Sequence, residues 1–237
     1  MVTLLKKQII KRTILCIFSL LLILSLVACS DGKNKKAFEA SKEAYDNINT
    51  AYELTSDFGS NIYDAWYTAI YESDELIDGG CEYLAKSLNL SEDELMDGAV
   101  YTLLQVEGKE LSECSEDDIE NLKAAADVIL EKINDNQNLS LFSWCLFMVE
   151  NAYMVNGKVD EIQAYLDAAK AQMKDLSENY SDYEHYPALK GYYTTTSSFF
   201  DFCQNSTGSF EQAKTTIEKY KTDARDYKAD LDYIFED

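Results

Sequence analysis

Apolar and small residues recur at alternating intervals of three and four along most of the chain after residue 37. This spacing puts them on one side of an α-helix, as in helices that pack along a narrow seam. The pattern is clearest after Ser209, where we predict one helix to the end of the chain. Its seam positions are Phe210, Ala213, Ile217, Tyr220, Ala224, Tyr227, Leu231 and Ile234.

The same spacing predicts helices in most of the remaining chain. A long first helix is expected from residue 38, with a break at 78–80, and further helices over 95–106, 119–133 and 159–176. Residues 139–155 are apolar on nearly all sides, which is typical of a buried helix, although part of this segment could instead form an exposed partner surface. The first helix carries two rows: Phe38, Tyr45, Tyr52, Gly59 and Trp66, and Ser41, Ile48, Thr55, Ile62 and Ala69.

Several residue patterns predict where helices begin. Ser91–Glu94 and Ser209–Gln212 have the spacing of capping boxes, and acidic residues after Ser115 suit a first helical turn. Pro187 also suits a first turn, where its missing N–H is no loss.

The expected turns divide the chain into long segments. Reversals near residues 89, 136 and 181 would leave four arms, with Gly108, Gly157 and Gly208 as breaks or kinks within the later arms. We therefore predict an all-α fold, an elongated antiparallel helical bundle of four long arms. The alternative treats every glycine as a full reversal and gives six to eight shorter helices. One proline and nine glycines in 237 residues agree with either helical arrangement, because strand-rich domains use more of both in turns.

The N-terminal segment has a different pattern. Basic residues (Lys6, Lys7, Lys11 and Arg12) precede an apolar run over 14–24, which ends in Leu26-Val27-Ala28-Cys29. These four residues resemble the lipobox of bacterial lipoproteins. The alternative is an uncleaved membrane anchor, but residues 14–28 fall short of the roughly 20 apolar residues that a spanning helix needs.

The resemblance implies a processed and lipidated protein. Residues 1–28 would be a signal peptide that is removed, and the Cys29 thiol would receive diacylglycerol. Residues 29–36 would then form a short tether, and 37–237 the helical bundle domain. The expected location is the cell membrane, on its extracytoplasmic face, held there by the N-terminal lipid.

Charge and the few reactive residue types narrow the possible functions. After residue 28 the chain has 17 basic and 43 acidic residues, which excludes nucleic acid as a partner. His185 is the only histidine, so Asp182 and His185 offer one ligand pair at best, and we expect no metal site and no cofactor. Only His185 could easily serve as the base for a nucleophile, so we expect no enzyme; a hydrolase that uses paired carboxylates is a weaker alternative.

The four remaining cysteines are far apart in sequence. Cys81, Cys114, Cys145 and Cys203 form no C-x-x-C pair and are expected to be small apolar residues within helices. One disulfide in an oxidising compartment stays open as an alternative.

One segment could bind a ligand. Five hydroxyl residues, 194–198, follow several aromatic residues, and Tyr192, Thr195, Thr196 and Phe199 could line a polar pocket. The alternative is that the hydroxyls bond back to helix carbonyls and the aromatic rings pack in the core.

These observations predict a membrane-anchored lipoprotein that acts as a non-enzymatic helical scaffold or interaction module, with a protein partner at the cell surface. The alternative is a ligand-binding or sensing lipoprotein with a pocket between helices.

Overall fold

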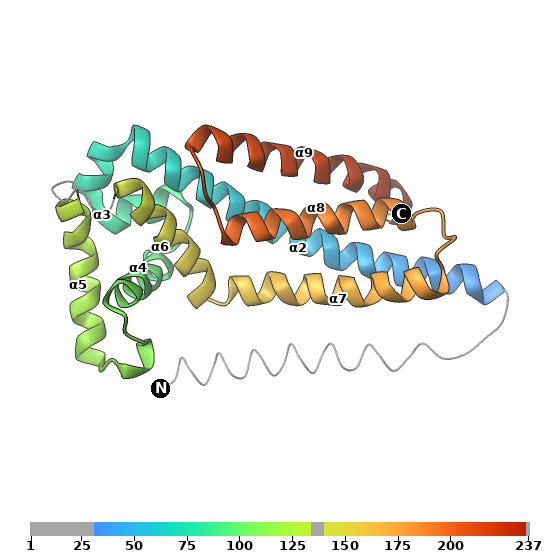
Figure 1. The fold of residues 1–237 in the computed structure, drawn as a ribbon, viewed down its shortest axis with the longest axis horizontal. Helices are drawn as coiled ribbons and strands as arrows, with labels where there is room; N and C mark the ends of the chain where they lie inside the picture. The colour runs from blue at the N-terminus through green and yellow to red at the C-terminus, as the bar shows by residue number, and fades with distance from the viewer. Residues whose placement is uncertain (1–30, 134–139, 236–237) are drawn as a thin grey trace. The chain divides into compact units, whose positions relative to one another are not determined.

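The computed structural model describes residues 31–133 and 140–235 (Figure 1). Within these ranges the chain forms eight α-helices and one 3₁₀ turn, η1, and no β-strand. The predicted all-α class is therefore confirmed. The lipobox residues 26–29 lie outside the described residues, as does the reversal expected near residue 136. The elements are α2 (Asp31–Tyr71), α3 (Ser73–Ser87), α4 (Glu92–Glu107), η1 (Leu111–Glu113), α5 (Glu116–Ile133), α6 (Leu141–Val155), α7 (Lys158–Asn179), α8 (Tyr186–Gln204) and α9 (Phe210–Phe235).

The chain divides into two compact units, residues 1–38 and 39–237, and the architecture described here is that of the second. From residue 39 onward, α2 runs alongside α7, α8 and α9 (Figure 1). These four helices enclose a core that includes Tyr45 and Ile48 of α2, Leu176 of α7, Tyr192 of α8 and Leu231 of α9. Heptad rows predicted from the sequence supply these side chains, because one face of each helix is apolar.

A second, larger core surrounds the C-terminal part of α2. There Phe58, Ile62 and Trp66 are fully buried together with apolar residues of α3, α4 and α6. The closest helix contact is at Gly98 of α4, where an added Cβ would lie 2.3 Å from the carbonyl oxygen of Met148 in α6. Only glycine permits this approach, since the obstructing atoms belong to the backbone of α6.

The predicted division into four arms is not confirmed. Helix α4 packs against α5, and α8 packs against α9, so the chain reverses at Gly108 and at Gly208. Both glycines have positive φ, which allows the sharp change of direction. The described helices thus follow the shorter-helix alternative more closely, because an antiparallel neighbour buries an apolar face that a straight continuation would leave exposed.

Helix boundaries differ from expectation at both ends of the first segment. Helix α2 begins at Asp31, so residues 31–36 are helical where a tether was expected. It ends at Tyr71 and not at 78–80; the expected break appears as a kink at Gly80 inside α3, with φ 59°. The predicted starts at Ser91 and Ser115 hold, because each serine hydroxyl accepts a hydrogen bond from the N–H three residues later.

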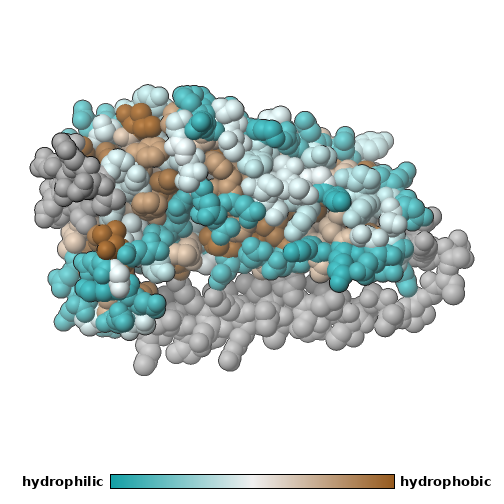
Figure 2. Space-filling view, viewed as in Figure 1, coloured by the Kyte–Doolittle hydropathy of each residue, from teal (hydrophilic) through white to brown (hydrophobic). Residues whose placement is uncertain are grey.

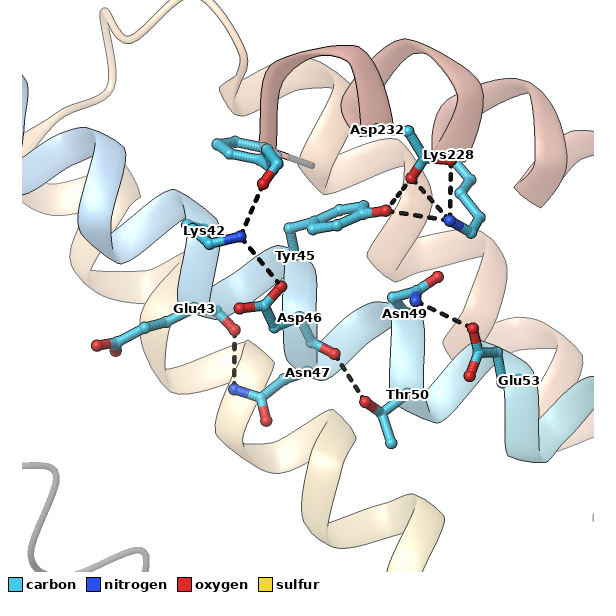
Figure 3. Close-up of polar contacts among 11 residues, drawn as sticks. Lys42, Glu43, Tyr45, Asp46, Asn47, Asn49, Thr50, Glu53, Lys228 and Asp232 are labelled. Carbon is cyan, nitrogen blue, oxygen red and sulfur yellow. Dashed lines mark hydrogen bonds and ion pairs between the residues drawn. The ribbon is translucent and has the colours of Figure 1, made fainter. Parts of the chain in front are cut away.

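A polar network joins helices α2 and α9 (Figure 3). The Tyr45 hydroxyl of α2 donates to Asp232 of α9, and Lys228 Nζ lies 2.7 Å from Asp232 Oδ1 and 3.2 Å from the Tyr45 oxygen. Burial opposes the charge on Lys228, but the hydrogen bonds to Asp232 and Tyr45 outweigh it and raise the lysine pKa. A second link is the 2.7 Å bond from Lys42 Nζ to the Phe235 carbonyl. These contacts attach the C-terminal turns of α9 to α2.

We predict that Asp232→Asn lowers the free energy of unfolding by about 1–3 kcal/mol, because it leaves the half-buried Lys228 ammonium without its carboxylate. Thermal or urea unfolding followed by circular dichroism measures this. The matched control is Asp223→Asn, which removes the partner of the exposed Lys219 on the same helix and with the same four-residue spacing. An equal effect of both substitutions would contradict a special role for the network.

Candidate functional site

The residues predicted to bind a ligand lie mostly in the core. Tyr192 is buried and its hydroxyl donates to Asn49 Oδ1 at 3.0 Å. Phe199 is buried and stacks on Tyr220 with ring centroids 5.4 Å apart. Thr195 is half-buried and Thr196 is fully buried. The structure therefore brings Tyr192, Thr196 and Phe199 onto the packed face of α8.

The hydroxyl groups of residues 194–198 differ in their hydrogen bonding. Thr194 Oγ1 donates back to the Lys190 carbonyl at 2.8 Å, as helical threonines do. Thr196 Oγ1, in contrast, has no hydrogen-bond partner among the described residues. The hollow nearest this run is a shallow groove of about 330 Å³ between α7 and α8, which Tyr193 and Thr194 line but the four predicted residues do not. The ligand-binding role of Tyr192, Thr195, Thr196 and Phe199 stays a prediction.

The reactive side chains identified in the sequence are dispersed. His185 precedes α8, with its Nε2 3.2 Å from Glu184 Oε1. Cys114, Cys145 and Cys203 are free thiols; Cys81, Cys145 and Cys203 are buried and Cys114 is half-buried. Burial raises the pKa of the Cys145 thiol to about 12. Among the described residues, no three histidine, cysteine, aspartate or glutamate side chains are placed to hold a metal ion.

The most distinctive exposed feature is a set of aromatic rings in contact with one another, here called the tyrosine ladder: Tyr63, Tyr67 and Tyr71 of α2 with Phe210 of α9. The three tyrosines are four residues apart, so they lie on one side of α2. Ring centroids are 6.3 Å apart for Tyr63 and Tyr67, and 4.9 Å for Tyr67 and Tyr71. Phe210 contacts both ends, at 5.3 Å from Tyr63 and 5.8 Å from Tyr71.

The outer part of the ladder is open to solvent. Tyr67 is 40% exposed, Tyr71 is 59% exposed, and the adjacent Ile70 is 42% exposed. Tyr63 and Phe210 are half-buried and support the exposed rings from below. Large apolar side chains gathered in this way commonly mark a surface that binds another molecule. The four-residue spacing is present in the sequence. The heptad rows on the neighbouring side of α2 predict core positions, however, and do not indicate that the tyrosines at this spacing are exposed.

The surroundings of the ladder are strongly acidic. Residues 43–85 contain ten aspartates and glutamates and no lysine, arginine or histidine. Asp64, Asp74 and Glu75 are the acids nearest the ladder in sequence besides Glu72, whose carboxylate accepts a hydrogen bond from Tyr83. Burial raises the pKa of Asp64, and nearby Lys221 opposes this shift while Glu72 adds to it. The ladder thus combines aromatic rings with a negative field.

Apolar surface is unevenly distributed on the visible face. In Figure 2 brown residues lie over α3, α5 and α6, and a further brown band runs between α8 and α7. Helices α7 and α9 present mostly teal or pale residues.

Comparison with protein-family models, with curated proteins and with solved structures gave no match. Among the described residues, no helix has both the length and the apolar character needed to cross a bilayer.

Glu150 of α6 is an acid held in an unfavourable environment. Its Oε1 atom is buried and has no hydrogen-bond partner among the described residues. Burial raises the pKa of this carboxyl to about 7, although interactions with Ser206 favour the charged form. The folded chain therefore binds this proton more tightly than the unfolded chain does.

We predict that ionisation of Glu150 destabilises the fold as pH rises. The penalty is absent below the ordinary pKa of 4.5, grows as pH rises through about 7, and is full above that value. Glu150→Gln should remove this part of the pH dependence, which amounts to about 3 kcal/mol at most. Urea unfolding between pH 4.5 and 8 measures it, with the exposed Glu120→Gln as control. Parallel stability profiles for wild type and Glu150→Gln would contradict the assignment.

Proposed function

We propose that the protein is a lipid-anchored, extracytoplasmic interaction module without enzymatic activity, and that the tyrosine ladder is its docking surface. The anchor rests on the resemblance of residues 26–29 to a lipobox. The docking surface rests on one observation: Tyr67, Ile70 and Tyr71 expose large apolar side chains close together on one helix. A protein partner that buries these side chains removes apolar surface from water, and this burial favours binding.

This proposal agrees with how the chain uses its polar groups. Buried hydroxyl and amide groups such as those of Tyr192 and Asn151 bond to other side chains of the protein. Cys145 and Cys203 are buried thiols, and His185 lies beside Glu184. An aromatic, acidic and rigid helical surface suits recognition better than bond chemistry.

The docking role predicts a position-specific contact in cells. Tyr71 is replaced by the photoreactive amino acid p-benzoylphenylalanine in the full chain, and intact cells are irradiated. We expect one discrete crosslinked species, identified by mass spectrometry. The same replacement at Tyr233, which is 87% exposed at the far end of α9, is the control and should give none. An uncrosslinked protein at residue 71, or the same products from both positions, would remove the support for docking at the ladder.

The anchoring role predicts that Cys29→Ser prevents lipid attachment, because a hydroxyl does not replace the thiol in diacylglycerol transfer. The protein should then leave the washed membrane fraction, and its intact mass should lack the acyl chains. Cys16→Ser, within the segment that is removed, should behave as wild type. Retention of the Cys29→Ser protein in membranes with an unmodified residue 29 in the wild type would show that this thiol is not the anchor.

A further inference from the structure

We infer that the partner of the tyrosine ladder is a protein segment rich in arginine or lysine, which stacks its cationic groups on Tyr67 and Tyr71 and pairs with the acids beside them. This inference rests on the proposed docking function and adds the chemistry of the partner.

The exposed rings of the ladder can attract a cationic group. The aromatic face carries partial negative charge, so a guanidinium or ammonium group over it is attracted, which changes affinity by about two- to fivefold at an exposed site. The chain already makes such contacts within itself: Lys158 Nζ lies 5.0 Å from the centroid of the Tyr153 ring. Tyr67 and Tyr71 are partly exposed with their ring centroids 4.9 Å apart, and Phe210 packs against Tyr71.

The acidic residues after Tyr71 also favour a cationic partner. Asp74 and Glu75 are exposed in the first turn of α3, a few residues beyond Tyr71. The sequence from 43 to 85 contains no basic residue, and Lys221 of α9 interacts with Asp64. A cationic segment fits this surface, whereas an anionic segment or polymer is repelled. A neutral glycan could stack on the rings but would leave the acids without partners.

Shape agrees with an extended segment. The ladder follows the axis of α2 over three successive turns, with the acids at its C-terminal end. Residues spaced along a partner segment can therefore contact rings and carboxylates at once. Ile70, which lies between Tyr67 and Tyr71 and is 42% exposed, adds an apolar contact for the stem of an arginine or lysine side chain.

The test measures binding of a fluorescein-labelled 12-residue peptide of alternating arginine and alanine to the full lipidated chain in a neutral detergent. Fluorescence anisotropy gives the affinity. The matched probe contains citrulline at every arginine, which keeps the shape and removes the charge. We expect the arginine peptide to bind, the citrulline peptide to bind at least about tenfold more weakly, and the affinity of the arginine peptide to fall with added salt.

Two double variants locate the contact. Tyr67→Ala with Tyr71→Ala should weaken arginine-peptide binding about fivefold or more, the sum of two exposed cation–π contacts. Asp74→Asn with Glu75→Gln should weaken it and flatten its salt dependence. The controls are Tyr233→Ala, and Glu92→Gln with Asp93→Asn, which neutralises two acids in the first turn of α4 in the same way. Circular dichroism checks that each variant is folded.

The outcomes separate the inference from the proposed function. Equal affinity for the arginine and citrulline peptides, unchanged binding by either folded double variant, or preferential binding of an N-acetylglucosamine tetramer would overturn the inference. If residue 71 still crosslinks to one protein in cells, the docking function stands without its cationic partner. Absence of any crosslink at residue 71 removes both.

Discussion

The burial of one face of α2 is the constraint on which the second unit depends. Tyr45 and Ile48 enter the core shared with α7, α8 and α9, while Phe58, Ile62 and Trp66 enter the core shared with α3, α4 and α6. Because both cores use the same continuous helix, neither can rearrange without changing the position of the other. The network of Tyr45, Lys228 and Asp232 links the C-terminal turns of α9 to α2.

A helix that serves two cores also has a side that serves neither. On α2 this side carries the tyrosine ladder, whose outer rings stay exposed although Phe210 packs beneath them. Because the helix and the contacts between the rings restrict their movement, covering them with a partner costs the protein little conformational entropy. The recognition that we propose for this surface therefore depends on the same packing that stabilises the fold.

The negative charge of the chain links stability to environment. Acids outnumber bases by 43 to 21, and most of this excess lies on helix surfaces where water screens it. Glu150 is the exception because it is held against Ser206 away from water. Cations, or a cationic protein segment at the ladder, reduce the repulsion that such a surface imposes on the compact state.

Sequence alone determined the helical class, the capped starts at Ser91, Ser115 and Ser209, and the buried positions of α9, because these follow from local hydrogen bonding and from the helical period. It also predicted the lipobox, which lies outside the described residues. Tertiary structure decided that Gly108 and Gly208 are reversals, because only contact between neighbouring helices distinguishes a kink from a turn. It likewise decided that Thr196 and Phe199 are core residues while Tyr67 and Tyr71 remain exposed. A periodic pattern marks two adjacent sides of a helix as apolar, and only the position of the neighbouring helices selects which of them is covered.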